Sequence, residues 1–557
     1  MEAAARASHS LEYGGKLRLQ AEGRGAGARS DSRGLLVSAA SPEAEPAAAF
    51  AGRSATKTQI RGSSLLLVGR LLSMGINTLV QVLIVRSLSK TDYGAFAYAL
   101  SFVSLGETVV TMGLDRAVTR FIPMYDERRE YGKLLGTVAF VLGAMLGLGL
   151  VTLLLVTGLQ GVISGRLIDD RQAVTLLVVL IPLALIQSLD SLAVGMFAVF
   201  ARPGAIFFRR YVLAPGLRLV VVLLLILDHS GAMFLAAGYV VGETVGVVLY
   251  GVILVHAMRA RGLFARAVIR DLQLPAREIL AFTFPLLTSD LVYVIMNVSD
   301  AVLLGYFGSV GEVAAFRAIQ PTAKLNQLVM SSFAFLFMPL AARMLARDDR
   351  EGINALYWQT AIWLSVLSFP VFLLTFSLAQ PLTLTLYGRA YSQSWVYLAL
   401  LSFGTYIQAA SGFNGLTLKV VGRLRYIVVI NSFAAVMNVL VNLALIPRYG
   451  ALGAALGTCG AYVLHNVLKQ AGLRMGTGVA LFPRGGGMVY GAIALGACGL
   501  LAIQTLLSPP LWLGVGLAAL VSLVVLWISR PVLRVGEAFP ELMRFRLVRA
   551  LIGSPRH

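Results

Sequence analysis

Long apolar segments recur along this chain and limit its possible folds more than any other feature. The hydrocarbon core of a bilayer is about 30 Å thick, so a helix that crosses it needs about 20 apolar residues. Runs of this length recur between residues 62 and 529 of the 557-residue chain, in which 57% of the residues are hydrophobic and only 13% are charged. This composition is far from that of a soluble globular protein. The sequence therefore predicts an all-α polytopic membrane protein.

The apolar runs divide into fourteen predicted membrane-spanning helices. Two of them, at 94–120 and 311–342, are long, and we expect them to tilt or to extend past the bilayer. Cys459 and Cys498 both fall inside predicted spans, so no disulfide framework is expected and both are interpreted as packing residues. The spans are 62–86, 94–120, 134–158, 173–200, 206–227, 231–256, 279–305, 311–342, 355–378, 391–415, 426–446, 450–470, 487–507 and 510–529.

Positive charge is distributed unevenly over the connections between the spans. If the N-terminus is cytoplasmic, the connections on that side contain twenty Lys and Arg residues, Arg209 and Arg210 among them, whereas those on the opposite side contain six. Basic loops are retained on the cytoplasmic side. We therefore predict a multi-pass protein of the cytoplasmic (inner) membrane with both termini cytoplasmic. Because the formal charge of +20 is dispersed over short loops, no nucleic-acid partner is expected.

An internal repeat predicts two related halves. The segment SKTDYGAFAYA at 89–99 is similar to SVGEVAAFRAI at 309–319, and FIPMY at 121–125 is similar to FMPLA at 337–341. Six spans separate the two copies, so both halves begin on the same side and are parallel repeats about an axis along the membrane normal. This pseudo-two-fold symmetry predicts a central cavity between the halves.

The repeat and the local composition together predict the domain organisation. Residues 1–60 are rich in Ala, Gly, Ser, Arg and Glu and contain neither a long apolar run nor a signal-peptide pattern. We interpret them as disordered, and of the two alternatives, a regulatory arm or sequence upstream of the true start that is dispensable, we favour the dispensable tail. The predicted parts are a disordered cytoplasmic tail at 1–60, an N-terminal six-helix bundle at 61–270, a C-terminal six-helix bundle at 271–475, two peripheral helices at 476–530 and a cytoplasmic tail at 531–557.

Four spans contain polar residues at steps of three and four positions, which places each set on one face of a helix. Two of these polar stripes include positive charge, and all four lie on helices that are equivalent in the two halves. We therefore expect the polar faces to converge on the cavity and to form a transport path. The stripes are Arg70, Ser73, Asn77 and Gln81; Ser101, Ser104, Thr108, Thr111 and Asp115; Asp290, Tyr293, Asn297 and Asp300; and Arg317, Gln320, Lys324, Gln327 and Ser331.

Two longer segments resemble a known family. They are GRLLSMGINTLVQVLIVRSLSKTDYGAFAYALSF at 69–102 and NVLVNLALIPRYGALGAALGT at 438–458. From about residue 57 to 529 the chain resembles the Wzx-type polysaccharide and oligosaccharide flippases of the multidrug/oligosaccharidyl-lipid/polysaccharide (MOP) exporter superfamily. The resemblance implies a MATE-like fold of two six-helix bundles with two extra helices. It also implies alternating-access movement of lipid-linked oligosaccharide, for polysaccharide biosynthesis, through a cationic cavity.

The cavity residues are predicted from the cost of charge in a membrane. A charge at the bilayer centre costs roughly 2.5–3.5 kcal/mol on insertion scales, so a buried Arg or Lys pairs with a partner or lines water. A guanidinium fork and an ammonium both suit the oxygens of a lipid pyrophosphate, and side-chain amides suit sugar hydroxyls. Arg116 is instead expected to extend to the membrane surface. The predicted substrate-binding residues are Arg70, Asn77, Gln81, Asn297, Arg317, Gln320, Lys324 and Gln327.

Carboxylates inside the spans raise the question of ion coupling. We predict that Asp115, Asp290 or Asp300 exchanges a proton, a sodium ion or an ion-pair partner as the two halves rock. In the alternative interpretation, these acids pair with Arg70 or Lys324 as structural contacts between the halves. Further charged residues inside the spans are Glu107, Asp190, Arg218 and Glu243.

Neither a cofactor nor an enzymatic activity is expected. The sequence contains no GxxxxGK[ST] or HExxH motif, and its five histidines are scattered. A membrane polymerase or ligase would need a larger outer loop than the one near 159–172.

Two transporters are the closer alternatives. One is a MATE-type drug or cation antiporter, for which twelve helices and an acidic cavity are expected, and the other is a lipid II flippase. By resemblance only, the partners are lipid-linked oligosaccharide, membrane lipids and the enzymes of polysaccharide biosynthesis.

Overall fold

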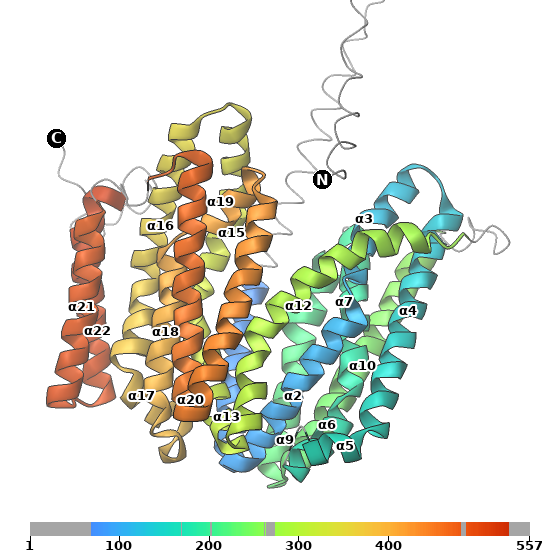
Figure 1. The fold of residues 1–557 in the computed structure, drawn as a ribbon, viewed down its shortest axis with the longest axis horizontal. Helices are drawn as coiled ribbons and strands as arrows, with labels where there is room; N and C mark the ends of the chain where they lie inside the picture. Colours follow the sequence, from blue (N-terminus) through green and yellow to red (C-terminus); the bar gives the residue numbers. More distant parts are fainter. Residues whose placement is uncertain are drawn as a thin grey trace, which may run out of the picture. The chain divides into compact units, whose positions relative to one another are not determined.

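The computed structural model describes residues 68–166, 168, 170–200, 203–260, 262, 273–480 and 486–533. Throughout this part the chain is helical and contains no strand (Figure 1). Twelve helices are long and apolar enough to cross a membrane, and the bent pair Val310–Ala334 and Phe337–Ala346, with a 48° bend, makes a thirteenth span. The predicted all-α membrane fold is confirmed. The predicted tail at 1–60 and residues 534–557 lie outside the described residues.

Two groups of helices follow one another along the chain. The first consists of helix Val68–Ser87, α2 (Lys90–Thr111), α3 (Leu114–Glu127), α4 (Tyr131–Gly158), α5 (Gln160–Arg166), α6 (Arg171–Leu180), α7 (Pro182–Val199), α8 (Pro203–Phe207), the π-helical turn η1 (Phe208–Leu213), α9 (Ala214–Leu227) and α10 (Ala232–Ala260). The second consists of α12 (Ala276–Phe307), α13 (Val310–Arg317), α14 (Gln320–Lys324), η3 (Leu325–Gln327), α15 (Leu328–Ala346), α16 (Arg350–Phe372), η4 (Leu373–Ser377), α17 (Ala379–Tyr387), η5 (Arg389–Tyr391), α18 (Ser394–Ala410), α19 (Asn414–Val420), α20 (Leu424–Thr477), α21 (Gly487–Leu507) and α22 (Leu511–Leu533). The residue boundaries assigned above to the two bundles stay a prediction.

The 54-residue helix α20 is a hairpin of two helices. Its backbone leaves the helical region at Gly450, where φ is +54° and ψ is −131°. The Tyr426 hydroxyl donates to the Leu468 carbonyl at 2.7 Å, although these residues would be roughly 63 Å apart in a straight helix. Counted as two spans, this hairpin brings the described part of the chain to the fourteen spans that the sequence predicts.

The repeated segments begin their helices in the same way. The Ser89 hydroxyl accepts from the backbone N–H of Asp92 at 3.0 Å at the start of α2, and the Ser309 hydroxyl accepts from the N–H of Glu312 at 3.3 Å at the start of α13. Such caps satisfy a free N–H at a helix N-terminus. The two capped helices then pack against one another, since a Cβ on Gly94 would lie 1.9 Å from the Val310 carbonyl oxygen. The two copies of the repeat therefore meet at one end of the helices, below in Figure 1.

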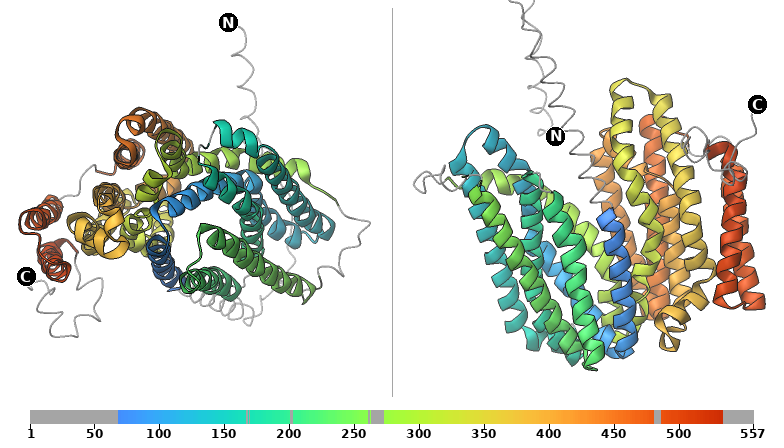
Figure 2. Two further views of the ribbon diagram at one scale, coloured as in Figure 1. Left: turned by 90° about the horizontal axis from the view of Figure 1, so that it is seen from below. Right: turned by 180° about the vertical axis from the view of Figure 1, so that it is seen from behind.

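The last two helices lie at the edge of the second group. Helices α21 and α22 contact each other, α16 and η4. Figure 2 shows them, in red, at the margin of the helical array. The two extra C-terminal helices that the fold class requires are thus present.

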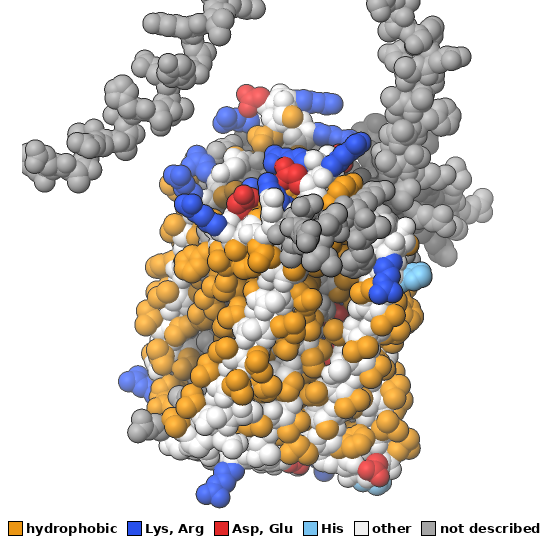
Figure 3. Space-filling model, turned by 90° about the vertical axis from the view of Figure 1, so that its right-hand side faces the viewer, with side chains coloured by type: hydrophobic (Ala, Val, Ile, Leu, Met, Phe, Trp, Pro, Cys, Tyr) orange, Lys and Arg blue, Asp and Glu red, His pale blue; other side chains and the backbone are white. Residues whose placement is uncertain are grey.

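Helix α10 has one exposed apolar face and one face that is buried in the protein. Val241, Val245, Val248 and Val252 are each more than half exposed and follow the spacing of one helical face. Glu243 is buried on the same helix. On one side of the molecule, Figure 3 shows hydrophobic side chains over the middle and most of the visible Lys and Arg at the upper end. An apolar band bounded by charge fits a protein whose solvent is the bilayer.

Candidate functional site

A large polar cavity lies among the helices of the first group. Its volume is about 1170 Å³, and its walls are formed by helix Val68–Ser87, α2, α3, α7, η1, α9 and α10. Pro321 and Lys324 of α14 are the described lining residues from the second group, so the cavity is less symmetric than the repeat predicts. Six basic and four acidic residues leave an excess of two positive charges in the lining: Arg70, Arg116, Arg209, Arg210, Arg218, Lys324, Glu107, Asp115, Asp190 and Glu243.

The first predicted stripe lies wholly in this cavity. Arg70, Ser73, Asn77 and Gln81 all belong to its lining. The Asn77 amide donates to the carbonyl and hydroxyl oxygens of Ser73 at 2.8 and 3.0 Å, and the Gln81 amide donates to the Tyr93 hydroxyl. The helix is unbroken from Val68 to Ser87, and therefore the spacing of three and four residues keeps these side chains on one face.

The second stripe does not form a single face. Helix α2 ends at Thr111, where Met112 and Gly113 adopt positive φ values of 45° and 69°, and Asp115 lies in the first turn of α3. Of the stripe residues only Asp115 belongs to the lining, and Ser101 accepts a hydrogen bond from Arg317 instead. The prediction of one continuous polar face is wrong because the two positive φ values turn the chain between the helices.

The fourth stripe is also interrupted. Helix α13 ends at Arg317, and three short elements with different helical geometry follow before α15 begins. Lys324 belongs to the cavity lining. The side chain of Gln320 instead accepts a hydrogen bond from Arg317 at 2.9 Å, and that of Gln327 donates one to Gln408 at 2.7 Å. Arg317 also donates to Ser101 at 2.8 Å and so joins the two groups of helices. Neither Arg317 nor the two glutamines belong to this cavity's lining.

Residues of the third stripe, on α12, have their partners on α3 and α20. Asp290 pairs with Arg116 at 2.7 Å. Asp300 is buried and accepts from Asn442 at 2.5 Å and from Thr458 at 2.8 Å, both on α20. Asn297, on the same helix, does not belong to the cavity lining.

The ion pair between Asp290 and Arg116 is not among the pairs considered from the sequence above. Asp290 pairs with Arg116 rather than with Arg70 or Lys324, the partners that the alternative interpretation gives it. Arg116 itself belongs to the cavity lining and its side chain is 48% exposed, while its extension to the membrane surface stays a prediction.

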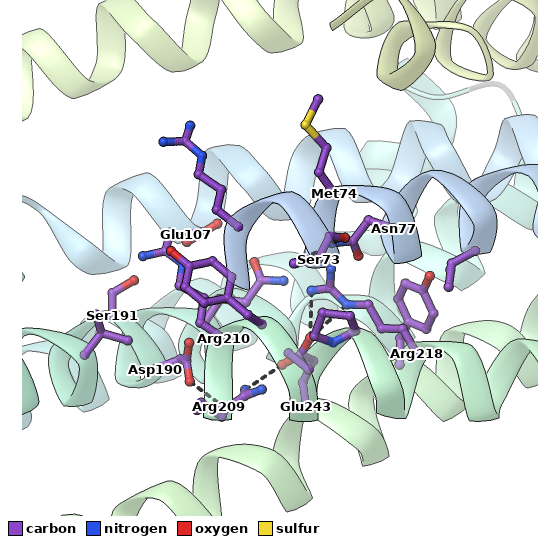
Figure 4. A pocket seen from close by; sticks show the side chains of 18 of the residues that line it. Ser73, Met74, Asn77, Glu107, Asp190, Ser191, Arg209, Arg210, Arg218 and Glu243 are labelled. Atoms are coloured by element: carbon purple, nitrogen blue, oxygen red, sulfur yellow. Dashed lines mark hydrogen bonds and ion pairs between the residues drawn. The ribbon is translucent and has the colours of Figure 1, made fainter. Parts of the chain in front are cut away.

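A partly buried cluster of four charged residues forms one wall of the cavity, and we refer to it as the Arg209 cluster (Figure 4). The Nε atom of Arg209 lies 2.9 Å from Asp190 Oδ1, and its Nη2 donates to Glu243 Oε2 at 2.8 Å. The Nη2 of Arg218 donates to the other oxygen of Glu243 at 2.7 Å. The side chain of Arg209 is only 1% exposed. The four residues come from α7, η1, α9 and α10, which lie apart in the sequence.

The charge count above places Arg209 in a connection, whereas the predicted span 206–227 includes it, and the structure agrees with the span, Gly204–Leu227. Arg209 is in the π-helical turn η1, where the N–H of Ala214 donates to the Arg209 carbonyl five residues back. Pro215 follows directly, and a proline has no N–H to donate and clashes with the carbonyl four residues earlier. A wide π turn relieves this clash, and such turns occur frequently at functional sites. The sequence signal was the presence of Asp190, Arg218 and Glu243 in three separate spans, but only the fold shows that they meet.

Comparisons with known proteins agree with the fold and the sequence. The polysaccharide biosynthesis protein family model matches residues 60–345, more than half of the chain, and the MatE family model matches residues 285–444. An uncharacterized membrane protein of Methanocaldococcus jannaschii is 21% identical over 426 residues, which cover 74% of this chain and 83% of that protein.

Two solved structures share the fold. The lipid II flippase MurJ, in an inward closed conformation, has a TM-score of 0.64 at 14% identity and covers 87% of this chain and 100% of its own. An inward-facing multidrug resistance MATE family transporter of the MOP superfamily has a TM-score of 0.54 at 16% identity, over 72% of this chain and 98% of its own. The chain therefore belongs to the polysaccharide biosynthesis protein family, within the MOP superfamily of membrane transporters.

Proposed function

We propose that this transporter moves a lipid-linked oligosaccharide, with its sugars on a polyprenyl pyrophosphate carrier, across the cytoplasmic membrane by alternating access, for polysaccharide biosynthesis. The observation that carries the proposal is the polar cavity with six basic residues against four acidic ones. A pyrophosphate is a multiply charged anion, and guanidinium and ammonium groups are its usual partners in proteins. Enzymes of polysaccharide biosynthesis would supply the cargo.

The size and lining of the cavity support a large polar head group. Pockets for drug-sized molecules are usually about 300–1000 Å³, and this cavity of about 1170 Å³ is larger. Asn77 and Gln81 place side-chain amides along one wall, where they can bond sugar hydroxyls. The lipid tail stays outside, against the apolar surface of the helices.

The arrangement of the two groups of helices supports alternating access. At the end where Ser89 lies, which the charge bias predicts to be the outer end, α2 packs closely on α13. Arg86 donates to the Leu386 carbonyl of α17 at 2.9 Å and also contacts the Thr385 carbonyl. These contacts close the Ser89 end, while the cavity lining extends to Arg70 and Thr119 near the opposite helix ends.

The test is the sidedness of lipid-linked oligosaccharide in cells that lack the protein. We expect the lipid to accumulate in the cytoplasmic leaflet, and wild type but not the double variant Arg70→Ala plus Lys324→Ala to relieve the accumulation. The control variant is Arg350→Ala, because this arginine is exposed and lies outside the cavity lining. Unchanged sidedness without the protein would contradict the proposed cargo.

A lipid II flippase is the second candidate, because a protein of that name shares the fold over 87% of this chain. Measuring the sidedness of lipid II in the same cells separates the two cargoes. A MATE-type antiporter is the third candidate, favoured by the matching family model at 285–444, and would instead show ion-dependent drug efflux. Asp115 is the predicted coupling acid that lines the cavity, and neutralising it tests whether transport depends on an ion gradient.

A further inference from the structure

The Arg209 cluster contains a guanidinium whose hydrogen-bonding capacity is only partly used. A guanidinium has five N–H donors, and only Nη2 of Arg209 makes a hydrogen bond among the residues that the structure describes. Its Nη1 is buried without an acceptor there. Its Nε lies at ion-pair distance from Asp190 but lacks hydrogen-bond geometry. Buried donors are normally satisfied, so this side chain is prepared for an additional acceptor.

A single carboxylate holds the two arginines together. Oε1 of Glu243 accepts from Nε and Nη2 of Arg218 at 3.0 and 2.7 Å, and Oε2 accepts from Arg209. One turn further along α10, a Cβ on Gly246 would lie 2.9 Å from Cζ of Arg209, so the missing side chain makes room for the guanidinium. The guanidinium groups of Arg209 and Arg218 therefore both bind the carboxylate of Glu243.

The cluster is electrically balanced and faces the cavity. Arg209 and Arg218 offset Asp190 and Glu243, and Arg210 lines the cavity beside them. Arg218 is 34% exposed, whereas Glu243 is 8% exposed behind it, so a ligand in the cavity reaches Arg218 first (Figure 4). A phosphate carries more charge than a carboxylate and offers more acceptor oxygens to two guanidinium forks.

We propose that Arg209 and Arg218 form a diphosphate-binding subsite in the cavity and that Glu243 is its internal counter-ion, which the phosphate of the cargo displaces. This inference rests on the proposed function and names the part of the cavity that binds the head group. The diphosphate takes the place of the Glu243 carboxylate beside Arg218. Its oxygens also accept hydrogen bonds from Nε and Nη1 of Arg209, which lack an acceptor among the described residues. The sequence-predicted Arg70 and Lys324 then lie elsewhere in the same cavity.

The test is ligand binding to the purified full-length protein in detergent, with farnesyl diphosphate and inorganic pyrophosphate as probes. We expect Arg218→Gln to weaken farnesyl diphosphate binding by about tenfold or more, because a charge-assisted bidentate contact is lost. We expect Glu243→Gln to strengthen it by about tenfold, because the competing carboxylate is removed. Thermal unfolding of each variant shows that it is folded, and Arg218→Lys, which keeps the charge without the fork, should bind with intermediate affinity.

The matched control is Glu107→Gln, which removes another acid from the lining of the same cavity. If it strengthens binding as much as Glu243→Gln does, the effect is general electrostatics and the counter-ion role is overturned. The subsite would also be overturned if Arg218→Gln bound farnesyl diphosphate with wild-type affinity, or if Glu243→Gln bound it no more tightly than wild type.

The two probes and a second pair of variants separate the possible outcomes. Binding of both probes shows that the diphosphate alone is recognised, and binding of farnesyl diphosphate alone shows that the isoprenyl chain is also needed. If only Arg70→Ala plus Lys324→Ala weakens binding, the subsite lies at those residues and the proposed function stands. If neither probe binds wild type or Glu243→Gln, this inference fails, while the leaflet assay still decides the proposed function.

Discussion

Two aspartates on α12 show how the surroundings of a carboxylate determine its role. Asp300 is 1% exposed and accepts hydrogen bonds from Asn442 and Thr458 of the α20 hairpin. The Asp290 side chain is 26% exposed and forms an ion pair with Arg116, whose side chain is 48% exposed. The sequence presents both as intramembrane acids at a helical spacing. Their different partners arise from the packing of α12 against α20 and α3, which periodicity does not reveal.

Asp300→Ala should destabilise the protein by about 1–3 kcal/mol, because it leaves the buried Asn442 and Thr458 donors without their acceptor. Asp300→Asn keeps one carbonyl oxygen and should lose less. Thermal unfolding in detergent measures both. Asp290→Ala is the control and should cost no more than about 1 kcal/mol, since exposed ion pairs contribute little. Equal losses at the two positions would contradict a structural role for Asp300.

Among the elements, α2 and α13 carry the contact that closes the Ser89 end. A serine caps the N-terminus of each helix, and the two sequences are the two copies of the internal repeat. Their approach depends on Gly94, since no side chain fits between it and the Val310 carbonyl. Under the alternating access proposed above, the two halves separate and re-form this contact once per transport cycle.

Gly94→Ala should prevent full closure of the Ser89 end and reduce transport, because the added Cβ would lie 1.9 Å from the Val310 oxygen. The measurement is the rate at which the complemented cells clear cargo from the inner leaflet. Gly75→Ala is the matched control, because no described atom lies within 4 Å of the Cβ that it adds. Equal rates for the two variants would show that this contact is not part of the cycle.

The helix count was predictable from the sequence, but the breaks in the helices were not. Long apolar runs are a property of each segment alone, so the fourteen spans follow from length and composition. The turn at Met112 and Gly113, the π turn at 208–213 and the short turns between α13 and α15 depend on local backbone geometry. For this reason the unbroken helix keeps Arg70, Asn77 and Gln81 together in the cavity lining, whereas two of the other stripes are divided between elements. That these residues bind substrate stays a prediction.

For the whole molecule, the two groups of helices are joined at the Ser89 end by Arg86 as well as by the α2 and α13 contact. Arg86 crosses from the first membrane helix to the carbonyl groups of Thr385 and Leu386, some three hundred residues later in the sequence. Hydrogen bonds from a charged donor contribute about 1.5–3 kcal/mol. Under the proposed alternating access, one such side chain shifts the balance between closed and open forms by a measurable factor.

Arg86→Ala should favour opening of the Ser89 end by about tenfold, the factor that corresponds to about 1.4 kcal/mol. The readout is the labelling rate of a cysteine placed at Ala97, which lines the cavity, by an impermeant maleimide applied from that side. Cys459 and Cys498 are first replaced by serine, so that only the new thiol reacts. Arg389→Ala is the control, an exposed arginine in the adjoining η5 turn. Equal labelling rates in Arg86→Ala and Arg389→Ala would show that Arg86 does not contribute to closure of the Ser89 end.

The balanced charges of the Arg209 cluster have a consequence for how such a cavity changes over evolutionary time. Two arginines and two acids cancel within the wall, so the sign of the cavity depends on a surplus of only two positive groups among ten charged residues. Loss of two basic side chains makes the lining neutral, and loss of a third makes it acidic. If the cargo is the anionic lipid proposed above, a few such substitutions suit the cavity to a cationic cargo, while the helices, their caps and their packing stay as they are.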